Sequence, residues 1–248
     1  MSRALYDNYV EFKNWSDGPK QGETASFANI LDSVGRSGTL DLLEVGFGDG
    51  SFMDWARDSG HKIAGLEIIP ELVEGARDRG HEAYLITQDM TMDRGFDAII
   101  AIDVLEHLDV SQFGDFFTLS EKVLKNNGVV VGRFPNGDSP FFGRYQYGDY
   151  THDKPLSWRA LHQIAIQHGF QVAKAVNPRP RPSRFASRVK QQLAYLVRDA
   201  IETILGFAYF GYRTPMDPNI IVIMCRRPSA EFTAQVSPGR ARADPPVG

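Results

Sequence analysis

The segment LLEVGFGDGSF, residues 42–52, decides how this chain folds. Its apolar start is typical of a buried strand, and its alternate glycines are typical of a turn. The residues after the glycines are typical of a helix. Because glycine has no Cβ, Gly46, Gly48 and Gly50 let a ligand lie against bare main chain at the helix N-terminus. Glu67 ends the next predicted strand, where a carboxylate can accept both hydroxyls of a ribose. The pattern indicates a nucleoside-cofactor site, and a tight turn without a ligand is the simpler alternative.

Two details of this segment separate the cofactor classes. A dinucleotide fingerprint, G-x-G-x-x-G/A, needs a small residue at position 51, for which Ser51 is an imperfect substitute, and Gly50 makes the pattern G-x-G-x-G. Glu44 precedes the first glycine near the end of a buried strand. Its negative charge would repel a pyrophosphate and attract an ammonium or sulfonium group. The segment therefore favours a cationic cofactor and disfavours a nicotinamide dehydrogenase.

Around this segment, short β-rich apolar runs alternate with amphipathic segments between residues 41 and 132. The alternation predicts an α/β fold, a doubly wound sheet covered by helices. The predicted strands are Asp41–Val45, Lys62–Glu67, Glu82–Ile86, Asp97–Ile102, Gly128–Arg133, Phe170–Val176 and Asn219–Cys225. The predicted helices and crossovers are Thr24–Val34, Ser51–Ser59, Pro70–Arg79, Gln88–Gly95, Ser111–Leu124, Ser157–His168 and Arg184–Phe210.

The chain is expected to divide into three parts. Residues 1–40 form an N-terminal helical cap, residues 41–228 the cofactor-binding domain, and residues 229–248 a disordered tail with little to bury. Within the domain, residues 177–218 form a helical insertion between the last two strands.

The composition is that of a globular protein. The 248 residues are 42% hydrophobic and 23% charged, with a formal net charge of -4, so we expect no nucleic-acid partner bound through a general basic field. A single cysteine, Cys225, excludes an intrachain disulfide and a Cys-rich zinc site. The sequence contains no stretch typical of a secretory signal or a bilayer span, which predicts a cytoplasmic protein.

The sequence resembles the class I S-adenosylmethionine-dependent methyltransferases in four motifs that follow the family's order. They are EVGFGDG at 44–50, GLEII at 65–69, QDM at 88–90 and FDAIIAIDVLEHL at 96–108. The resemblance covers about residues 40–227 and extends to sugar and small-molecule O-methyltransferases. It implies S-adenosyl-L-methionine as the cofactor and a Rossmann-like, seven-stranded sheet with a reversed terminal strand, antiparallel between two parallel ones.

The resemblance also implies which residues hold the cofactor. Glu44 and the glycine loop would hold its methionine part, Glu67 its ribose, and Asp89 with Met90 its adenine. Ile102, Asp103 and Leu105 would line the floor beneath the methyl group. The full implied set is Glu44, Gly46, Phe47, Gly48, Gly50, Glu67, Ile68, Asp89, Met90, Ile102, Asp103 and Leu105.

Two histidines are candidates for the chemistry. Methyl transfer from a sulfonium requires alignment of acceptor, methyl and sulfur, and an alcohol acceptor must also lose its proton, which a neutral histidine can take near pH 7. His152, in a loop with Asp149 and Asp153, is the first candidate for a general base or acceptor ligand, and His107 is the second, with structural roles as the alternative. One short loop supplies too few spaced ligands for a cation, so no metal is expected.

The segment from Phe134 to Tyr150 is expected to overhang the cofactor. Its aromatic residues can stack on apolar sugar or ring faces, and polar residues lie between them. The candidate acceptor-binding residues are Asn136, Arg144, Tyr147 and Tyr150. The loop therefore suits a glycan or small-molecule acceptor, and a lid without direct contact is equally compatible with the sequence.

Residues 184–212 join basic residues to an amphipathic helix with an aromatic end. Such a segment can contact an anionic membrane surface or a lipid-linked substrate. The sequence favours a simpler alternative, in which the same apolar stripe packs against the domain or in a homodimer.

Taken together, these features predict an S-adenosylmethionine-dependent methyltransferase. The acceptor is expected to be an oxygen of a sugar, polysaccharide or small molecule, with a histidine as general base. The alternative from another class is a methyltransferase-like protein that binds the cofactor and serves as a partner or regulator without turnover.

Overall fold

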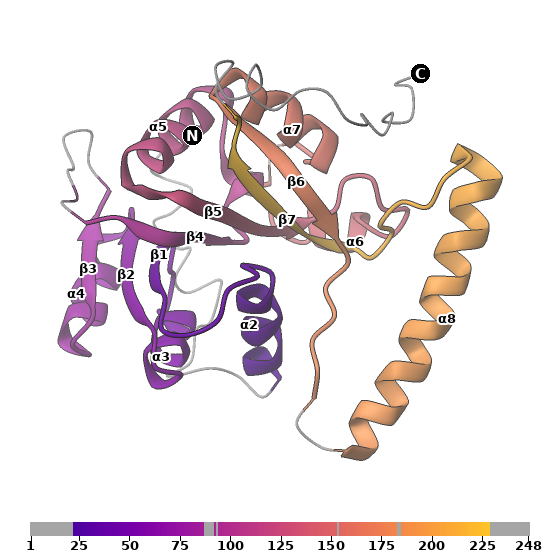
Figure 1. The fold of residues 1–248 in the computed structure, drawn as a ribbon, viewed down its shortest axis with the longest axis horizontal. Coiled ribbons are helices and arrows are strands. Elements are labelled where there is room, and N and C mark those ends of the chain that lie inside the picture. Colours follow the sequence, from indigo (N-terminus) through magenta and orange to yellow (C-terminus); the bar gives the residue numbers. More distant parts are fainter. Residues whose placement is uncertain (1–21, 87–91, 93, 153, 183–184, 229–248) are drawn as a thin grey trace.

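The computed structural model describes residues 22–86, 92, 94–152, 154–182 and 185–228. They form one seven-stranded sheet with the order β3-β2-β1-β4-β5-β7-β6 (Figure 1). The strands are β1 (Asp41–Val45), β2 (Lys62–Glu67), β3 (Glu82–Leu85), β4 (Phe96–Ile102), β5 (Leu124–Pro135), β6 (Phe170–Val176) and β7 (Asn219–Arg226). The helices are α2 (Glu23–Asp32), α3 (Ser51–Asp58), α4 (Pro70–Asp78), the short 3₁₀ helix η2 (Leu105–His107), α5 (Val110–Val123), α6 (Gly143–Gln146), α7 (Trp158–Gln167) and α8 (Phe185–Phe210).

The strand directions confirm the predicted fold class. Strands β3, β2, β1, β4 and β5 pair in parallel, and β7 is antiparallel to both of its neighbours, β5 and β6. The reversed terminal strand therefore lies inside the sheet, between two strands that share one direction. In the parallel part, β1 and β4 are apolar and largely buried, as strands covered on both faces must be.

All seven predicted strands are present, and the largest difference lies in β5. This strand begins at Leu124, which pairs with Phe96, and its register then shifts before Val129 pairs with Ala98. The predicted start at Gly128 marks the point where regular pairing resumes. The predicted crossover Gln88–Gly95 lies largely outside the described residues, as does the tail after residue 228.

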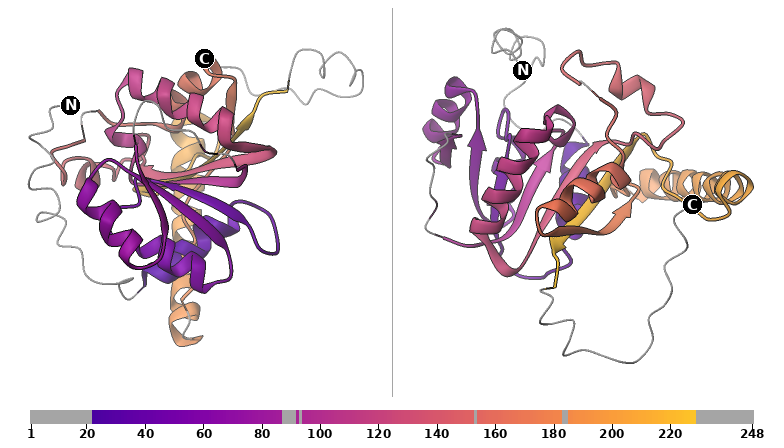
Figure 2. Two further views of the ribbon diagram at one scale, coloured as in Figure 1. Left: turned by 90° about the vertical axis from the view of Figure 1, so that its left-hand side faces the viewer. Right: turned by 90° about the horizontal axis from the view of Figure 1, so that it is seen from above.

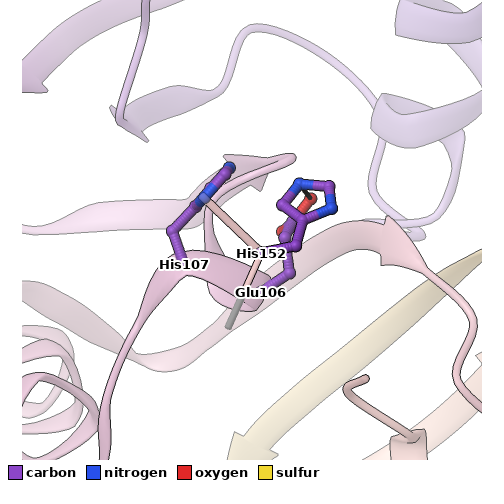
Figure 3. A group of neighbouring side chains, drawn as sticks. All are labelled: Glu106, His107 and His152. Atoms are coloured by element: carbon purple, nitrogen blue, oxygen red, sulfur yellow. Dashed lines mark ion pairs between the residues drawn. The ribbon is translucent and has the colours of Figure 1, made fainter. Parts of the chain in front are cut away.

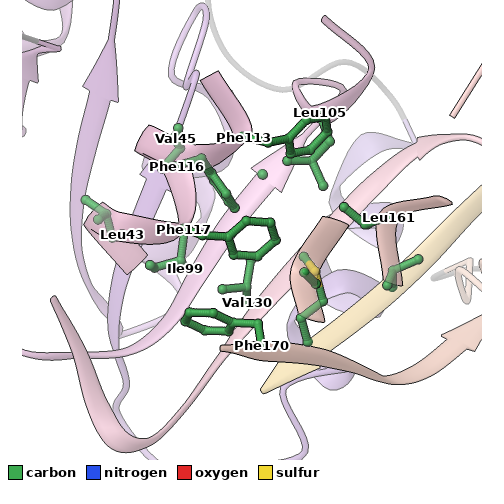
Figure 4. Packing of buried hydrophobic residues seen from close by; sticks show 14 of the residues in the cluster. Leu43, Val45, Ile99, Leu105, Phe113, Phe116, Phe117, Val130, Leu161 and Phe170 are labelled. Atoms are coloured by element: carbon green, nitrogen blue, oxygen red, sulfur yellow. The ribbon is translucent and has the colours of Figure 1, made fainter. Parts of the chain in front are cut away.

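Two hydrophobic clusters lie on opposite faces of the sheet. On one face, Phe113, Phe116 and Phe117 of α5 pack with residues from the strands and from α7 (Figure 4). On the other face, α2, α3 and α4 cover the sheet, and Phe27 of α2 contacts Phe52 of α3 with ring centroids 5.4 Å apart. The helix expected in the N-terminal cap thus forms as α2 and packs on the domain.

Helix α8 lies beside the sheet rather than on either face (Figures 1 and 2). It is inserted between β6 and β7, as the sequence predicts, and extended segments join it to both strands. Two short helices, η2 and α6, were not predicted. Both follow carboxyl ends of strands, which is the sheet edge where ligands bind in doubly wound folds.

Candidate active site

The glycine loop connects β1 to α3 through residues with left-handed backbone. Gly46 has φ 68° and Gly48 has φ 57°, conformations that favour glycine. A Cβ at position 46 would lie 2.5 Å from Cγ2 of Val104, which follows β4. The loop and the end of β4 are therefore in close contact, and no side chain larger than hydrogen fits at Gly46 without movement.

Glu67 ties the end of β2 to this loop. Its Oε2 accepts the N–H of Gly48 at 3.0 Å, and its Oε1 accepts the N–H of Ile68 at 2.7 Å. Burial raises the pKa of the Glu67 carboxyl, and the main-chain N–H donors, which include Gly48 and Ile68, only partly oppose that effect. The carboxylate is thus held rigidly at the strand end, and a carboxylate oxygen with further lone pairs can still accept a ribose hydroxyl.

Glu44 is the second carboxylate at this edge, and it is buried in β1. Burial raises the pKa of its carboxyl well above the ordinary value, and the nearby charges of Asp49 and Glu67 raise it further. Its Oε2 has no hydrogen-bond partner among the described residues. A buried carboxyl oxygen without a donor is costly, and a cationic ammonium group would supply both a charge and donors. The site therefore fits the methionine end of S-adenosylmethionine.

Asp103 and Leu105 shape the floor after β4. Asp103 has φ 54°, the only positive φ recorded for a non-glycine residue in the described chain, and its carboxylate pairs with Arg133 of β5. The Asp103 N–H also donates to the Arg133 carbonyl oxygen at 2.8 Å. A Cβ at Gly132 would lie 2.6 Å from Cδ1 of Leu105, so this buried leucine sits directly on β5.

The remaining cofactor candidates occupy different environments. Phe47 is buried in the hydrophobic cluster on the α3 side of the sheet, and Ile68 is exposed beside Glu67. Ile102 is half-buried at the end of β4, and Gly50 forms the N-cap of α3. The proposed adenine residues, Asp89 and Met90, lie outside the described residues.

His107 and His152 come together although they lie far apart in the sequence. Their ring centroids are 4.7 Å apart, and Nε2 of His152 lies 3.8 Å from Oε1 of the buried Glu106 (Figure 3). Nδ1 of His152 lies 3.2 Å from the carbonyl oxygen of Gln146 in α6. Because a carbonyl oxygen can only accept, this contact places the proton on Nδ1 and leaves Nε2 as the basic nitrogen of a neutral ring.

His107 is positioned through Thr151. Its Nδ1 lies 3.1 Å from Oγ1 of Thr151, whose hydroxyl in turn donates to Oδ1 of Asp149 at 2.5 Å. Since that hydroxyl proton is directed to Asp149, the Thr151 oxygen acts as the acceptor for Nδ1–H of His107. Through these contacts Asp149 acts on Thr151 and so on His107.

Glu106 was not among the predicted site residues. In the sequence, the only sign of a role for Glu106 is its position next to His107, a candidate histidine. A carboxylate exposed on the surface could occupy the same position, so this sign is weak. Glu106, His107 and His152 together could hold a metal ion, because a ligand atom of each lies within 4.8 Å of the others. No metal site was expected from the sequence, and that expectation stays a prediction, tested below.

The acceptor-binding candidates divide into one buried and three exposed residues. Asn136 is fully buried, and its amide nitrogen donates to the carbonyl oxygens of Pro215 and Asp217, each at 3.1 Å. This contact joins the loop to the segment before β7. Arg144 is exposed on α6, and Tyr147 and Tyr150 are 78% and 91% exposed, so all three can meet an incoming molecule.

The part of the chain that contains the glycine loop is similar to a known domain. Residues 43–132 match the family model described as a methyltransferase domain. No curated protein matches the chain at the level of its sequence. The match spans the glycine loop, both strand-end carboxylates and the Glu106–His107 pair.

Solved structures share the fold at low sequence identity. A SAM-dependent methyltransferase from Archaeoglobus fulgidus is 18% identical with a TM-score of 0.60, covering 88% of this chain and 99% of its own. An S-adenosylmethionine-dependent methyltransferase from Mesorhizobium loti is 15% identical with a TM-score of 0.54, covering 82% and 98%. The mitomycin 7-O-methyltransferase MmcR is also 15% identical with a TM-score of 0.54, covering 82% of this chain and 54% of its own.

The family model thus covers the part of the chain from β1 into β5, and the solved structures share the fold over most of its length. Residues 43–132 therefore carry a methyltransferase domain, and this match together with the shared fold supports S-adenosyl-L-methionine as the cofactor.

Proposed function

We propose that the chain transfers the methyl group of S-adenosylmethionine to a hydroxyl oxygen of a sugar, polysaccharide or small-molecule acceptor. The observation that carries this proposal is the basic Nε2 of His152 next to buried Glu106, just beyond the strand that ends at the cofactor edge. A hydroxyl group must lose its proton when its oxygen accepts the methyl group, so it requires a base. Methyl transfer to a nitrogen or sulfur atom has less need of a base in this position.

Each residue then has a defined task. The bound cofactor supplies an electrophilic methyl group on sulfur. Glu44 and the glycine loop orient its cationic end, and Glu67 orients its ribose. His152 takes the acceptor proton on Nε2, while its Nδ1–H bond to Gln146 fixes the ring. Glu106 stabilises the imidazolium that forms, because its Oε1 lies 3.8 Å from that nitrogen.

The proposed acceptor class rests on the exposed aromatic residues of the loop after β5. Tyr147 and Tyr150 present large apolar faces to solvent near α6, which also holds the carbonyl oxygen that fixes His152. Aromatic faces stack on sugar rings, and the exposed Arg144 can donate hydrogen bonds to their hydroxyls or to an acidic group. A polyhydroxylated ring therefore fits this surface better than a purely apolar molecule.

A survey of acceptors with methyl-labelled cofactor tests the proposal. We expect label to enter mono- and oligosaccharides or hydroxylated ring compounds, with mass spectrometry placing it on oxygen. With the acceptor in hand, His152→Ala should lower kcat by about 10²–10⁴ while calorimetry shows unchanged cofactor affinity. His152→Asn, whose amide nitrogen can replace Nδ1 in the hydrogen bond to Gln146 but is not basic, should be equally slow.

Two results would contradict this function. Label found only on nitrogen or sulfur would remove the need for His152 as a base. Cofactor binding with no turnover on any acceptor would support the regulatory alternative instead. Tyr150→Ala supplies an independent check on the acceptor surface, since it should raise KM for the acceptor without changing the affinity for the cofactor.

A further inference from the structure

Helix α8 turns its apolar side away from the domain. Apolar side chains along it are widely exposed, with Leu193 at 60% and Ile204 at 67%. The large apolar residues exposed along this side are Val189, Leu193, Leu196, Val197, Ile201, Ile204 and Phe207. Among the described residues the domain leaves this stripe exposed, so of the two packings that the sequence favours only the one in a homodimer stays open. We call these seven residues the outer face of α8.

Polar contacts join the opposite side of α8 to the segments that flank the helix. Arg179, before the helix, pairs with Asp199 at 2.7 Å and with Asp217 at 3.0 Å. Arg213, after the helix, pairs with Asp199 at 2.6 Å and with Glu202 at 2.8 Å. One arginine before the helix and one after it thus pair with the acidic residues on the inner side of α8. This arrangement orients the outer face outward as a defined surface instead of leaving it to rotate.

The charges of α8 favour an anionic occupant. Both acidic residues of the helix, Asp199 and Glu202, are engaged in these inner ion pairs. The first turns of the helix carry Arg188 and Lys190, which are exposed. Anionic lipid headgroups attract basic residues at the margin of an apolar helix face.

The far end of α8 carries aromatic residues that suit a membrane interface. Tyr209, Phe210 and Tyr212 are exposed, and neighbouring rings of this group lie with centroids 6.4 Å apart. Tyrosine is amphipathic and is enriched at the level of lipid headgroups. No helix among the described residues is long and apolar enough to cross a bilayer. An amphipathic helix of 26 residues can instead lie along its surface.

A second copy of the chain fits the outer face less well. Helix pairing uses a narrow apolar seam flanked by charged residues that fix register and partner. The seam Leu193, Val197 and Ile204 is flanked on α8 by Leu196 and Ile201, which are apolar and exposed. A broad apolar face without a single narrow seam has little to specify a partner helix, whereas a bilayer requires no register.

We propose that α8 docks the protein in plane on an anionic bilayer surface. The outer face enters the boundary between headgroups and acyl chains, Arg188 and Lys190 contact anionic headgroups, and the aromatic end lies at the interface. The ion pairs of Arg179 and Arg213 hold α8 against the two segments that connect it to β6 and β7. Docking is independent of methyl transfer, so it can be tested whether or not the proposed acceptor class is right.

Vesicle co-sedimentation of the full chain is the direct test. The probes are vesicles of phosphatidylcholine alone and of phosphatidylcholine mixed with phosphatidylglycerol. We expect binding to the mixed vesicles, weaker binding in high salt, and little binding to phosphatidylcholine alone. The triple variant Leu193→Gln, Ile204→Gln, Phe207→Gln should lower the partition coefficient by at least about tenfold. The double variant Arg188→Gln, Lys190→Gln should lower it on the anionic vesicles only.

Val110→Gln serves as the matched control, because Val110 is a 78% exposed apolar residue at the start of α5, away from α8. Its binding to vesicles should equal that of the natural chain. Circular dichroism and cofactor affinity should be unchanged in all variants, which separates lost docking from misfolding. The proposal is overturned if the natural chain does not bind anionic vesicles. It is equally overturned if sedimentation velocity shows a stable dimer, dissociated by the triple variant, that accounts for the outer face.

Discussion

The N–H of Gly48 donates to Oε2 of Glu67 at 3.0 Å, so a hydrogen bond joins the glycine loop to the carboxylate that we expect to bind the ribose. This bond joins the end of β2 to the turn after β1, and Glu67 also accepts from its own following main chain. Preorganisation of this kind lowers the cost of ordering the loop on binding. We therefore expect cofactor binding to require the loop conformation as well as its sequence.

Gly48→Val is therefore expected to abolish cofactor binding. Gly48 has φ 57°, a left-handed conformation that valine adopts poorly. The valine side chain would also occupy the space above the main chain of the loop where we expect the cofactor to lie. Titration calorimetry should show no detectable binding, while circular dichroism shows a folded chain. Unchanged affinity would remove the glycine loop from the site.

Gly60→Val provides the matched control for this strain. Gly60 also has a positive φ, 87°, but a Cβ there would meet nothing within 4 Å, and it precedes β2 at the opposite edge of the sheet. Both variants should lose about 1–2 kcal/mol of unfolding free energy from left-handed backbone. Only Gly48→Val should lose the cofactor.

The pKa of Glu44 predicts opposite pH responses for stability and for binding. Burial raises this pKa in the folded chain, so between pH 4.5 and the raised value the folded state holds a proton that the unfolded state has released. The unfolding free energy of the ligand-free protein therefore falls as the pH rises through that window. Cofactor affinity should rise over the same window, because a cation binds the ionised carboxylate.

Glu44→Gln separates these effects while keeping the shape of the side chain. At neutral pH we expect the ligand-free variant to be more stable by about 1 kcal/mol, since no buried charge forms, and to bind the cofactor at least about tenfold more weakly. Calorimetry from pH 5 to 8 should show a flatter affinity profile, with the slope that remains arising from Glu67, whose pKa is also raised. A variant with natural affinity would show that Glu44 does not meet the cationic end.

The sheet could be predicted because its signals are local. β1, β2 and β6 begin and end where the apolar runs do, and α4 begins at Pro70, as its missing N–H allows. The glycine loop and Glu67 follow from the same short-range pattern, since parallel strands bring their carboxyl ends to one edge.

Two features depend on contacts that no local pattern encodes. The pairing of His107 with His152 spans a segment that includes α5, β5 and α6, and it made Glu106 part of the site. The sequence identifies the apolar stripe of α8 but does not show that the stripe faces away from the domain. That orientation depends on ion pairs of Arg179 and Arg213 with residues that are not their neighbours in the sequence. Amphipathicity identifies a face without showing what covers it.

Asp97 makes a different kind of contribution, at the amino edge of the sheet. Its carboxylate accepts the N–H of Asp41 at 2.9 Å and pairs with Lys125 at 2.9 Å. Burial alone would raise its pKa, but these contacts outweigh that effect and lower it. The stabilisation is therefore present above the pKa of the unfolded chain and is lost as the pH falls through the lowered value.

Asp97→Ala should cost about 1 kcal/mol of unfolding free energy at neutral pH, a modest value because solvent screens part of the ion pair. Urea unfolding measures this loss, which should shrink in acid. The control is Asp58→Ala, which removes an exposed carboxylate that lies 3.5 Å from Arg57 and should change stability by less than about 0.5 kcal/mol. Equal losses in the two variants would contradict a specific role for Asp97.

Chelation distinguishes the two kinds of chemistry open to Glu106, His107 and His152. With His152 as a base, the purified protein should contain no stoichiometric transition metal by mass spectrometry, and turnover should survive treatment with EDTA. The reason is that Nε2 must be able to take a proton, which a bound cation would prevent. Calorimetry with Mn²⁺ and Zn²⁺ then gives a readout that does not depend on turnover. Tight binding that Glu106→Gln removes, together with loss of activity in EDTA, would make these three residues metal ligands and would exclude His152 as the base.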